Sequence, residues 1–246
     1  MGSGGSHHYE YMYHRYLAAL ARKRCGNGVI RLLEIGLGCG NFGGGNAATG
    51  NHSGAGGSVA RWLHLFDSSL FRLDYHMMEY DRKCVRQWSS QFPALARRVT
   101  MHVGDQSNKA DLIRVYEKSG SRPFDAVIDD GSHINDHQHV TMSTFLRNRW
   151  VARGGVYIIE DMSAACASFL VNEPLGPGYG RNESRTTAGT HNCLRTTLGR
   201  QGTPTMADHL VHYQKLLIRG QLPFFQVHTI AVFEEAAAFE VGREGT

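Results

Sequence analysis

Two short stretches of the sequence place acidic side chains and a histidine where they could act together. The first, IDDGSH, contains Asp129, Asp130 and His133, and the second, VYIIEDM, contains Glu160 and Asp161. Each stretch includes the end of an apolar run that is typical of a buried strand. Ligands of open α/β sheets collect beyond the carboxyl ends of the strands, so we expect four carboxylates and one imidazole in a small volume.

Such a group of side chains favours metal-assisted chemistry on a hydroxyl. Crowded carboxylates repel one another, and a bound divalent cation relieves that repulsion. Oxygen ligands without cysteine favour Mg²⁺, with Ca²⁺ and Mn²⁺ as alternatives. An alcohol bound to such an ion loses its proton more easily, and His133, three residues after Asp130, is placed to accept that proton.

The elements that would position these residues alternate along the chain. Helical patterns separate five strand-like runs, which are VIRLLEIG (29–36), FRLDYHMMEYD (71–81), VTMHVGD (99–105), FDAVIDD (124–130) and GVYIIED (155–161). A last helix is expected over 206–219, followed by a hairpin of FQVHTIAVF and AAAFEV. Because parallel strands need crossover connections, this alternation predicts an α/β protein with a parallel sheet and helices on both faces.

The remaining segments suggest a division of the chain. Residues 1–27 form an N-terminal helical segment, with the helix expected from Ser6 to Arg24, and 28–246 form the main domain. Within that domain, 41–58 is glycine-rich and reads as a flexible loop, after which Ser58 is expected to cap a helix. The stretch 172–204 is too long for an ordinary connection and reads as a lid or a disordered loop.

Composition narrows the class of protein. A chain of 246 residues with 41% hydrophobic and 20% charged residues is ordinary for one soluble domain. The net charge of +4 comes without a long basic run, so neither nucleic acid nor a membrane is indicated as a partner. The sequence has no apolar stretch of roughly 20 residues. We expect a cytoplasmic protein, with a removed leader left open, and a homo-oligomer is compatible with the sequence. Five scattered cysteines without CxxC spacing are expected to be reduced.

A glycine-rich turn after the first strand predicts a nucleotide-type cofactor. The run LLEIGLGCGNFGGG places Glu34 at the strand end and Gly36, Gly38 and Gly40 in the turn, where the backbone can approach a ligand closely. An acid at this point suits a cationic amino-acid group, as in S-adenosylmethionine, and would repel a pyrophosphate. The register Gly38–Gly43 also fits GxGxxG, so a nicotinamide-dependent oxidoreductase is an alternative.

Three motifs in order resemble class I methyltransferases, whose first motif has the form ExGxGxG. The resemblance implies that Glu79, in MMEYD, holds the ribose hydroxyls of S-adenosylmethionine. It implies that Asp105 and Gln106, in VGDQ, lie at the adenine, and Asp129 is placed with these cofactor residues. The fold implied is Rossmann-like, with a mostly parallel seven-stranded sheet and a C-terminal antiparallel hairpin.

A narrower resemblance is to the metal-dependent sugar O-methyltransferases of the macrocin and mycinamicin type. Their motif DDGSH is unchanged at 129–133, and their GGxYxIED appears as GGVYIIED at 154–161. A related branch of the fold uses iron, so Fe²⁺ joins the alternative metals. The resemblance implies three metal ligands and a general base, namely Asp130, Glu160 and Asp161 as ligands and His133 as base.

The function predicted is therefore metal-dependent O-methylation by S-adenosylmethionine. The acceptor would be a small hydroxylated molecule, either a sugar or a glycosylated metabolite. Besides the oxidoreductase, a non-catalytic S-adenosylmethionine-binding protein of the same fold is an alternative. Two groups are left with two interpretations. His137 and His139 could extend the metal site, but we favour surface positions. The tyrosines of 9–16 could line an acceptor pocket, but their helical spacing favours packing.

Overall fold

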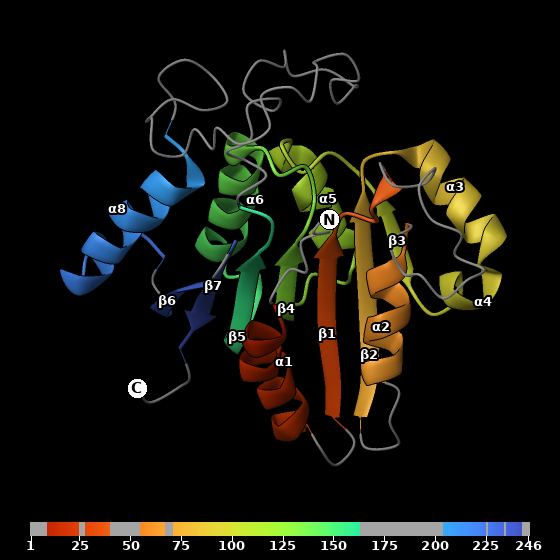
Figure 1. Cartoon of the computed structure of the whole chain (residues 1–246), viewed down its shortest axis with the longest axis horizontal. Coiled ribbons are helices and arrows are strands. Elements are labelled where there is room, and N and C mark those ends of the chain that lie inside the picture. Colours follow the sequence, from red (N-terminus) through yellow and green to blue (C-terminus); the bar gives the residue numbers. More distant parts are fainter. Residues whose placement is uncertain are drawn as a thin grey trace, which may run out of the picture.

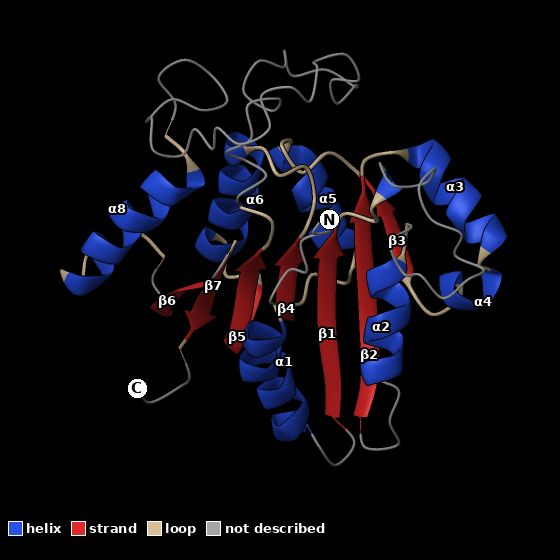
Figure 2. Cartoon of the chain, viewed as in Figure 1, coloured by secondary structure: helices blue, strands red, loops and turns tan. Residues whose placement is uncertain are grey.

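A seven-stranded sheet runs through the middle of the protein (Figures 1 and 2). The computed structural model describes residues 9–24, 28–39, 55–66, 71–162, 204–224, 226–233 and 235–242. The strand order is β3-β2-β1-β4-β5-β7-β6. The strands are β1 (Gly28–Ile35), β2 (Phe71–Glu79), β3 (Thr100–Val103), β4 (Phe124–Asp129), β5 (Val151–Ile159), β6 (Val227–Phe233) and β7 (Ala236–Val241).

The first five strands are parallel, and β7 lies antiparallel between β5 and β6. The prediction of a mostly parallel seven-stranded sheet with a C-terminal antiparallel hairpin is therefore confirmed. The strand order reverses at β1, which pairs with β2 on one side and with β4 on the other. Such a reversal opens a crevice at the carboxyl ends of the strands, which is where ligands bind in this class of fold.

Helices cover both faces of the sheet, as Figure 1 shows. Successive residues of β1 point to opposite faces, so that Leu32 packs in one hydrophobic cluster with Met12 and Trp62, while Leu33 packs in another with Leu112 and Phe145. The helices are α1 (Glu10–Arg24), α2 (Gly57–Leu65), α3 (Arg82–Gln91), α4 (Pro93–Ala96), α5 (Lys109–Lys118), α6 (Asn135–Arg147) and α8 (Met206–Ile218).

The start of α2 differs from its prediction. The helix begins at Gly57 after Gly56, whose φ is 77°, and within the described residues no side chain caps it. The expectation that Ser58 caps this helix is wrong, because Ser58 lies in the first turn and its side chain hydrogen-bonds to Glu34. A side chain at position 56 would meet the indole of Trp88, since a Cβ there would lie 2.1 Å from Trp88 Nε1.

Several predicted segments lie outside the described residues. These are Ser6 and the rest of 1–8, residues 40–54 of the glycine-rich loop, and residues 163–203, which contain nearly all of the predicted lid. Cys25, Cys166 and Cys193 also fall outside them. Cys39 and Cys84 form a disulfide, so the expectation of reduced thiols is wrong for this pair.

None of the helices in the described part of the chain is both long enough and apolar enough to cross a membrane.

Candidate functional site

The carboxyl ends of β1, β4 and β5 bring the predicted acids together. In the parallel register, Ile35 pairs with Asp129, and Asp129 pairs with Ile159. Five acids lie at the ends of these three neighbouring strands or directly after them, namely Glu34, Asp129, Asp130, Glu160 and Asp161. The backbone ties these ends together, because the Glu160 N–H donates to the Asp129 carbonyl at 3.0 Å.

The electrostatics of this cluster favour a cation. Burial raises the pKa of Glu34 to about 7, of Asp129 to about 6 and of Glu160 to about 8. The pKa of Asp130 is raised well above its usual range, first by burial and then by repulsion from Glu160 and Glu34. A divalent ion would favour the ionised form of all these carboxylates, and the oxygen donors suit a hard cation such as Mg²⁺.

Three side chains converge closely enough to share one ion. Donor atoms of Asp130, His133 and Asp161 all lie within 4.8 Å of one another. His133 Nε2 is 3.8 Å from Asp130 Oδ1 and 3.7 Å from Asp161 Oδ2. His133 and Asp161 both have left-handed backbones, with φ of 54° and 50°. For residues other than glycine this conformation costs on the order of 1–3 kcal/mol, and such strain is concentrated at functional sites.

Glu160 is not in this group of three, because its carboxylate meets the N-terminal helix. The Tyr13 hydroxyl donates to Glu160 Oε1. The Tyr9 hydroxyl donates to Asp161 Oδ1 at 2.5 Å and accepts from the Asp161 N–H at 2.9 Å. Two tyrosines of the helical stripe therefore reach the acids as well as packing. The helical spacing of the tyrosines is compatible both with packing and with a role at the site, so spacing alone could not predict these contacts.

The glycine turn comes next to the acid cluster. The Gly36 N–H donates to the Met78 carbonyl at 2.9 Å, and Gly36 and Gly38 have φ of 103° and 76°. Gly40 lies outside the described residues. Glu34 lies buried beneath the turn with 2% of its surface exposed, and its carboxylate accepts a hydrogen bond from the Tyr75 hydroxyl. The structure thus places Glu34 beneath the predicted cofactor loop rather than on its open surface.

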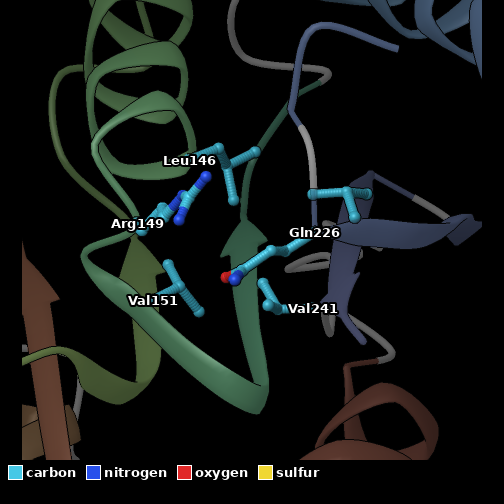
Figure 3. Close-up of a pocket in the computed structure, with 6 residues that line it drawn as sticks. Leu146, Arg149, Val151, Gln226 and Val241 are labelled. Carbon is cyan, nitrogen blue, oxygen red and sulfur yellow. The ribbon is translucent and has the colours of Figure 1, made fainter. Parts of the chain in front are cut away.

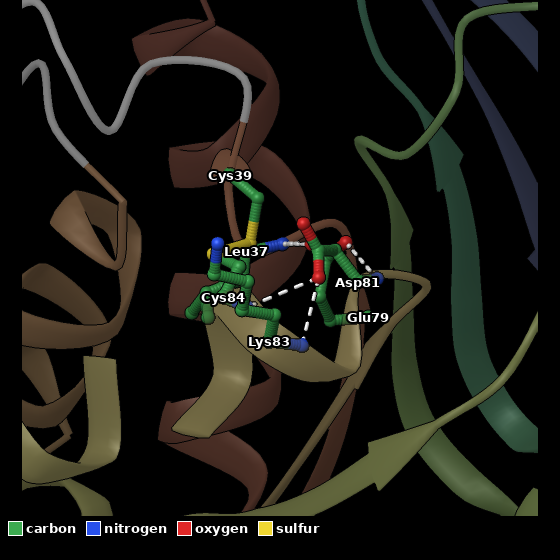
Figure 4. The surroundings of a disulfide bond; sticks show 6 residues. All are labelled: Leu37, Cys39, Glu79, Asp81, Lys83 and Cys84. Carbon is green, nitrogen blue, oxygen red and sulfur yellow. Dashed lines mark hydrogen bonds between the residues drawn. A yellow bond between two sulfur atoms is a disulfide. The ribbon is translucent and has the colours of Figure 1, made fainter. Parts of the chain in front are cut away.

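Glu79 braces the same turn from the end of β2. Its Oε2 accepts from the Leu37 N–H at 2.8 Å, and its Oε1 accepts from the Asp81 N–H at 2.9 Å. The Cys39–Cys84 disulfide lies beside these hydrogen bonds, as Figure 4 shows. The acid predicted to hold the ribose therefore sits against the glycine turn, with both carboxylate oxygens accepting from backbone N–H groups.

Gln106, one of the two residues predicted near the adenine, supports the DDGSH turn. Gln106 Nε2 donates to Asp129 Oδ1 at 2.9 Å, and Gln106 Oε1 accepts from the Ser132 N–H at 2.7 Å. Asp129 also accepts from the Tyr157 hydroxyl at 2.8 Å and is completely buried. Asp105 stays closer to the surface, where its Oδ1 accepts from the N–H of Ser107 at 2.8 Å.

Two features lie apart from the acids. His139 of α6 stacks on His209 of α8 with ring centroids 3.8 Å apart, and its Nε2 is 2.7 Å from the Tyr213 hydroxyl. His139 therefore belongs to the interface of the two helices. A hollow shown in Figure 3 lies near the other end of α6 and takes in none of the acids. Its lining residues are Leu146, Arg149, Val151, Gln226, Val227 and Val241.

The fold is that of an α/β methyltransferase. In one comparison the whole chain superposes on MycE methyltransferase from the mycinamycin biosynthetic pathway, in complex with Mg and SAH, with a TM-score of 0.60 and 24% identity over 53% of that chain. A second structure of MycE, with Mg, SAH and mycinamycin VI, gives a TM-score of 0.62 at 21% identity, with 100% of this chain and 51% of that chain covered. Similarity at this level of identity establishes the architecture.

The chain is a homologue of macrocin- and mycinamicin-type sugar O-methyltransferases. It is 32% identical to demethylmacrocin O-methyltransferase of Streptomyces fradiae over 139 residues, which is 56% of this chain and 29% of that enzyme. It is also 32% identical to mycinamicin VI 2''-O-methyltransferase of Micromonospora griseorubida over 174 residues, covering 70% of this chain and 34% of that enzyme. The chain thus spans about a third of the length of these relatives. No family model matches it.

Proposed function

We propose that the chain is an S-adenosylmethionine-dependent and divalent-metal-dependent O-methyltransferase that acts on a hydroxyl of a sugar or glycosylated metabolite. The observation that carries the proposal is the meeting of Asp130, His133 and Asp161 beside the glycine turn after β1. The homology to sugar O-methyltransferases supports it. A small hydroxylated molecule is the acceptor class that follows.

The metal would be held by acids at the ends of β4 and β5. Asp130 and Asp161 have donor atoms within 4.8 Å of each other, and Glu160 is the adjoining carboxylate of the IED motif. When bound, Mg²⁺ or a related cation supplies charge that lowers the pKa of a coordinated hydroxyl. The donor set of carboxylate oxygens fits Mg²⁺, and it leaves Mn²⁺, Ca²⁺ and Fe²⁺ as alternatives.

His133 would act as the general base. Its Nε2 is flanked by the carboxylates of Asp130 and Asp161, which stabilise the imidazolium formed when the ring accepts the acceptor's hydroxyl proton. The left-handed turn at His133 fixes the ring at this position. S-adenosylmethionine supplies an activated methyl group, so beyond proton removal the protein has mainly to align the two reactants.

The cofactor would lie across the glycine turn. We place its amino-acid portion at Gly36, Gly38 and Gly40 above Glu34, and its ribose at Glu79. Asp105 would reach the adenine from the loop after β3. Gln106 and Asp129 would support the site indirectly, because they hold the turn that contains Gly131 and Ser132. The packing there is tight, since a Cβ at Gly131 would lie 2.0 Å from Gln106 Oε1.

Calorimetric titration of the purified protein with S-adenosylmethionine tests this function. The titration is run with Mg²⁺, again after chelation, and with NAD⁺ in place of S-adenosylmethionine. Binding of S-adenosylmethionine without NAD⁺ binding is the expected result, followed by a mass increase of one methyl group on a hydroxylated glycoside in the presence of Mg²⁺. Binding of NAD⁺ alone, or of neither cofactor, would refute the proposal.

A further inference from the structure

The start of α1 reaches the acids through two tyrosines, Tyr9 directly before the helix and Tyr13 in its first turn. Tyr9 and Tyr13 stand four residues apart, one helical turn, and their rings meet edge to face with centroids 6.1 Å apart. Tyr13 also packs edge-on against Trp62 of α2 at 4.9 Å.

The contacts divide the oxygens of Asp161 between two partners. Asp161 Oδ1 accepts from the Tyr9 hydroxyl at 2.5 Å, whereas Oδ2 is the atom that faces His133 Nε2 at 3.7 Å. The Tyr9 oxygen also accepts from the Asp161 N–H at 2.9 Å, and Asp161 is the residue with φ of 50°. A single phenol thus fixes both the backbone and the rotation of this carboxylate.

Tyr13 contacts only the side chain of the neighbouring acid, Glu160. Its hydroxyl donates to Glu160 Oε1, and the ring cannot easily turn because Tyr9 and Trp62 pack against it. We propose that Tyr9 is a positioning residue that holds Asp161 in the orientation that binds the metal, and that Tyr13 positions the adjoining Glu160 through one oxygen, Oε1. The inference rests on the proposed function, and it adds α1 to the elements that build the metal site.

Metal affinity without an acceptor is the measurement that tests these roles. Tyr9→Phe and Tyr13→Phe keep the rings and remove the hydroxyls, and Tyr11→Phe is a matched control because Tyr11 is 67% exposed on the same helix. Loss of partners that orient a ligand typically weakens metal binding by about 10–100-fold. We expect a weakening of at least roughly 10-fold for Tyr9→Phe, a smaller one for Tyr13→Phe, and none for Tyr11→Phe.

Two outcomes distinguish failure of the positioning role from failure of the proposed metal-dependent function. If the wild-type protein binds Mg²⁺ or Mn²⁺ in calorimetry and both variants bind with the same affinity, the positioning role is wrong while the metal site stands. If the wild-type protein binds neither ion, the proposed metal-dependent function fails, and the positioning role fails with it. Thermal unfolding of each variant checks that a change in affinity does not come from a loss of fold.

A second inference comes from the disulfide, which joins the cofactor turn to α3. Cys39 lies in the turn after β1 and Cys84 lies in the first turn of α3, 45 residues apart with Cα atoms 6.0 Å from each other (Figure 4). Asp81 caps the same helix by accepting from the N–H groups of Lys83 at 2.7 Å and Cys84 at 3.1 Å. The covalent bond therefore reinforces the hydrogen bond from Leu37 to Glu79.

We infer that this disulfide is a redox-sensitive clasp on the cofactor turn. A dithiol reductant would attack Cys39 Sγ, because Cys39 is partly exposed whereas Cys84 is 6% exposed. The S–S bond breaks as a mixed disulfide forms, and the second thiol of the reductant then displaces Cys39. The reductant leaves as a disulfide, Cys39 and Cys84 become thiols, and the turn is freed from α3.

Hydrogen exchange at the Leu37 amide tests the clasp independently of any cofactor. The oxidised protein is compared with protein reduced by dithiothreitol and with the double variant Cys39→Ser, Cys84→Ser. We expect exchange at Leu37 to be at least several-fold faster after reduction, and equally fast in the double variant with or without the reductant. Unchanged exchange in protein whose two thiols are shown by alkylation to be free would overturn the clasp.

The effect of the clasp on the cofactor is measured by the affinity for S-adenosylmethionine. We expect reduction to weaken binding several-fold and to leave the double variant unchanged. Equal affinity of the oxidised and reduced proteins would limit the disulfide to a structural bond and refute its regulatory role. Absence of cofactor binding by the oxidised protein would refute the proposed function, while the exchange result would still decide whether the turn is clasped.

Discussion

Gly36 lies directly against the backbone of Asp130. A Cβ at position 36 would be 1.9 Å from the Asp130 carbonyl oxygen, and the φ of Gly36 is 103°. The contact lies where β1 and β4 end, since the Asp130 N–H donates to the Ile35 carbonyl at 3.0 Å. The first glycine of the proposed cofactor turn and the first proposed metal ligand are therefore packed against each other, so that a change at one must move the other.

Gly36→Ala should accordingly destabilise the protein and weaken both ligands. The new methyl group has no room against backbone atoms, and the positive φ adds strain. We expect a loss of more than about 2 kcal/mol of unfolding free energy, measured by urea denaturation. In the fraction that folds, calorimetry should give weaker binding of both S-adenosylmethionine and Mg²⁺.

Gly120→Ala separates strain from collision. Gly120 has a φ of 90°, and among the described residues nothing lies within 4 Å of the Cβ that would be added there. This variant should lose only about 1 kcal/mol and leave both ligands unaffected. Equal stability of the two variants would mean that the approach of Gly36 to Asp130 is not tight in solution.

Strand periodicity was enough to predict a parallel sheet, because five apolar runs, each ending in acids or glycine, repeat a local pattern, whereas the seven-stranded form came from the resemblance to class I methyltransferases. The same reasoning brought Asp130, His133 and Asp161 together, since parallel strands end at one edge. It missed what depends on contacts distant in sequence. Tyr9 and Asp161 are 152 positions apart, and neither residue's neighbours signal the pairing.

Local rules also failed where a second partner competed. Ser58 has the type of residue that caps helices, but its hydroxyl is used by the buried Glu34 instead. Cys39 and Cys84 lack a recognisable spacing, and only the folded turn brings their Cα atoms to 6.0 Å. Glu34, Glu79 and Asp129 lie at strand ends as expected, whereas the burial of Glu34 and Asp129 depends on partners that are distant in sequence, Tyr75 for Glu34 and Gln106 and Tyr157 for Asp129.

Acid should destabilise the protein through buried histidines. Burial and then repulsion from His76 lower the pKa of His102 to about 4 from its ordinary value of 6.5. At His102 the folded protein therefore binds fewer protons than the unfolded chain between these pH values, so the stability that His102 contributes is full above pH 6.5 and is lost as pH falls toward 4. The raised pKa values of Glu34, Asp129 and Glu160 act in the opposite direction. For His102 alone the loss is about 3 kcal/mol.

Urea unfolding at a series of pH values measures how the free energy of unfolding changes with pH. In His102→Gln the titrating ring is absent, so the variant should become more stable relative to the wild type as pH falls from 6.5 to 4. His139, whose pKa is lowered to about 4 by burial and by His209, contributes the slope that persists in the variant. An identical slope in both proteins would contradict a buried, neutral His102.

The support under the DDGSH turn can be tested through Gln106. Gln106→Leu removes the donor to Asp129 and the acceptor for the Ser132 N–H, and it leaves two buried polar groups short of a partner. We expect a loss of roughly 2–4 kcal/mol in unfolding free energy and weaker Mg²⁺ binding, because His133 follows directly after Ser132. Ser107→Ala in the same loop removes a hydrogen bond to Asp105 that lies outside this turn, so it should cost no more than about 1 kcal/mol and leave Mg²⁺ binding unchanged. Full metal affinity in Gln106→Leu would show that the turn holds its shape without this side chain.

Replacement of His133 by asparagine distinguishes a base from a metal ligand. If His133 removes the acceptor's proton, kcat should fall by about 10²–10⁴-fold while the affinities for S-adenosylmethionine and Mg²⁺ stay within a factor of two or so of the wild type. If instead Asp130, His133 and Asp161 form the coordination sphere that their donor atoms allow, calorimetry should show that Mg²⁺ affinity is lost together with turnover. Glu160→Gln is the matched variant. If His133 is the base, Glu160 is the third metal ligand. Metal binding should then be lost in Glu160→Gln and kept in His133→Asn. Unchanged turnover in His133→Asn would remove the histidine from both roles.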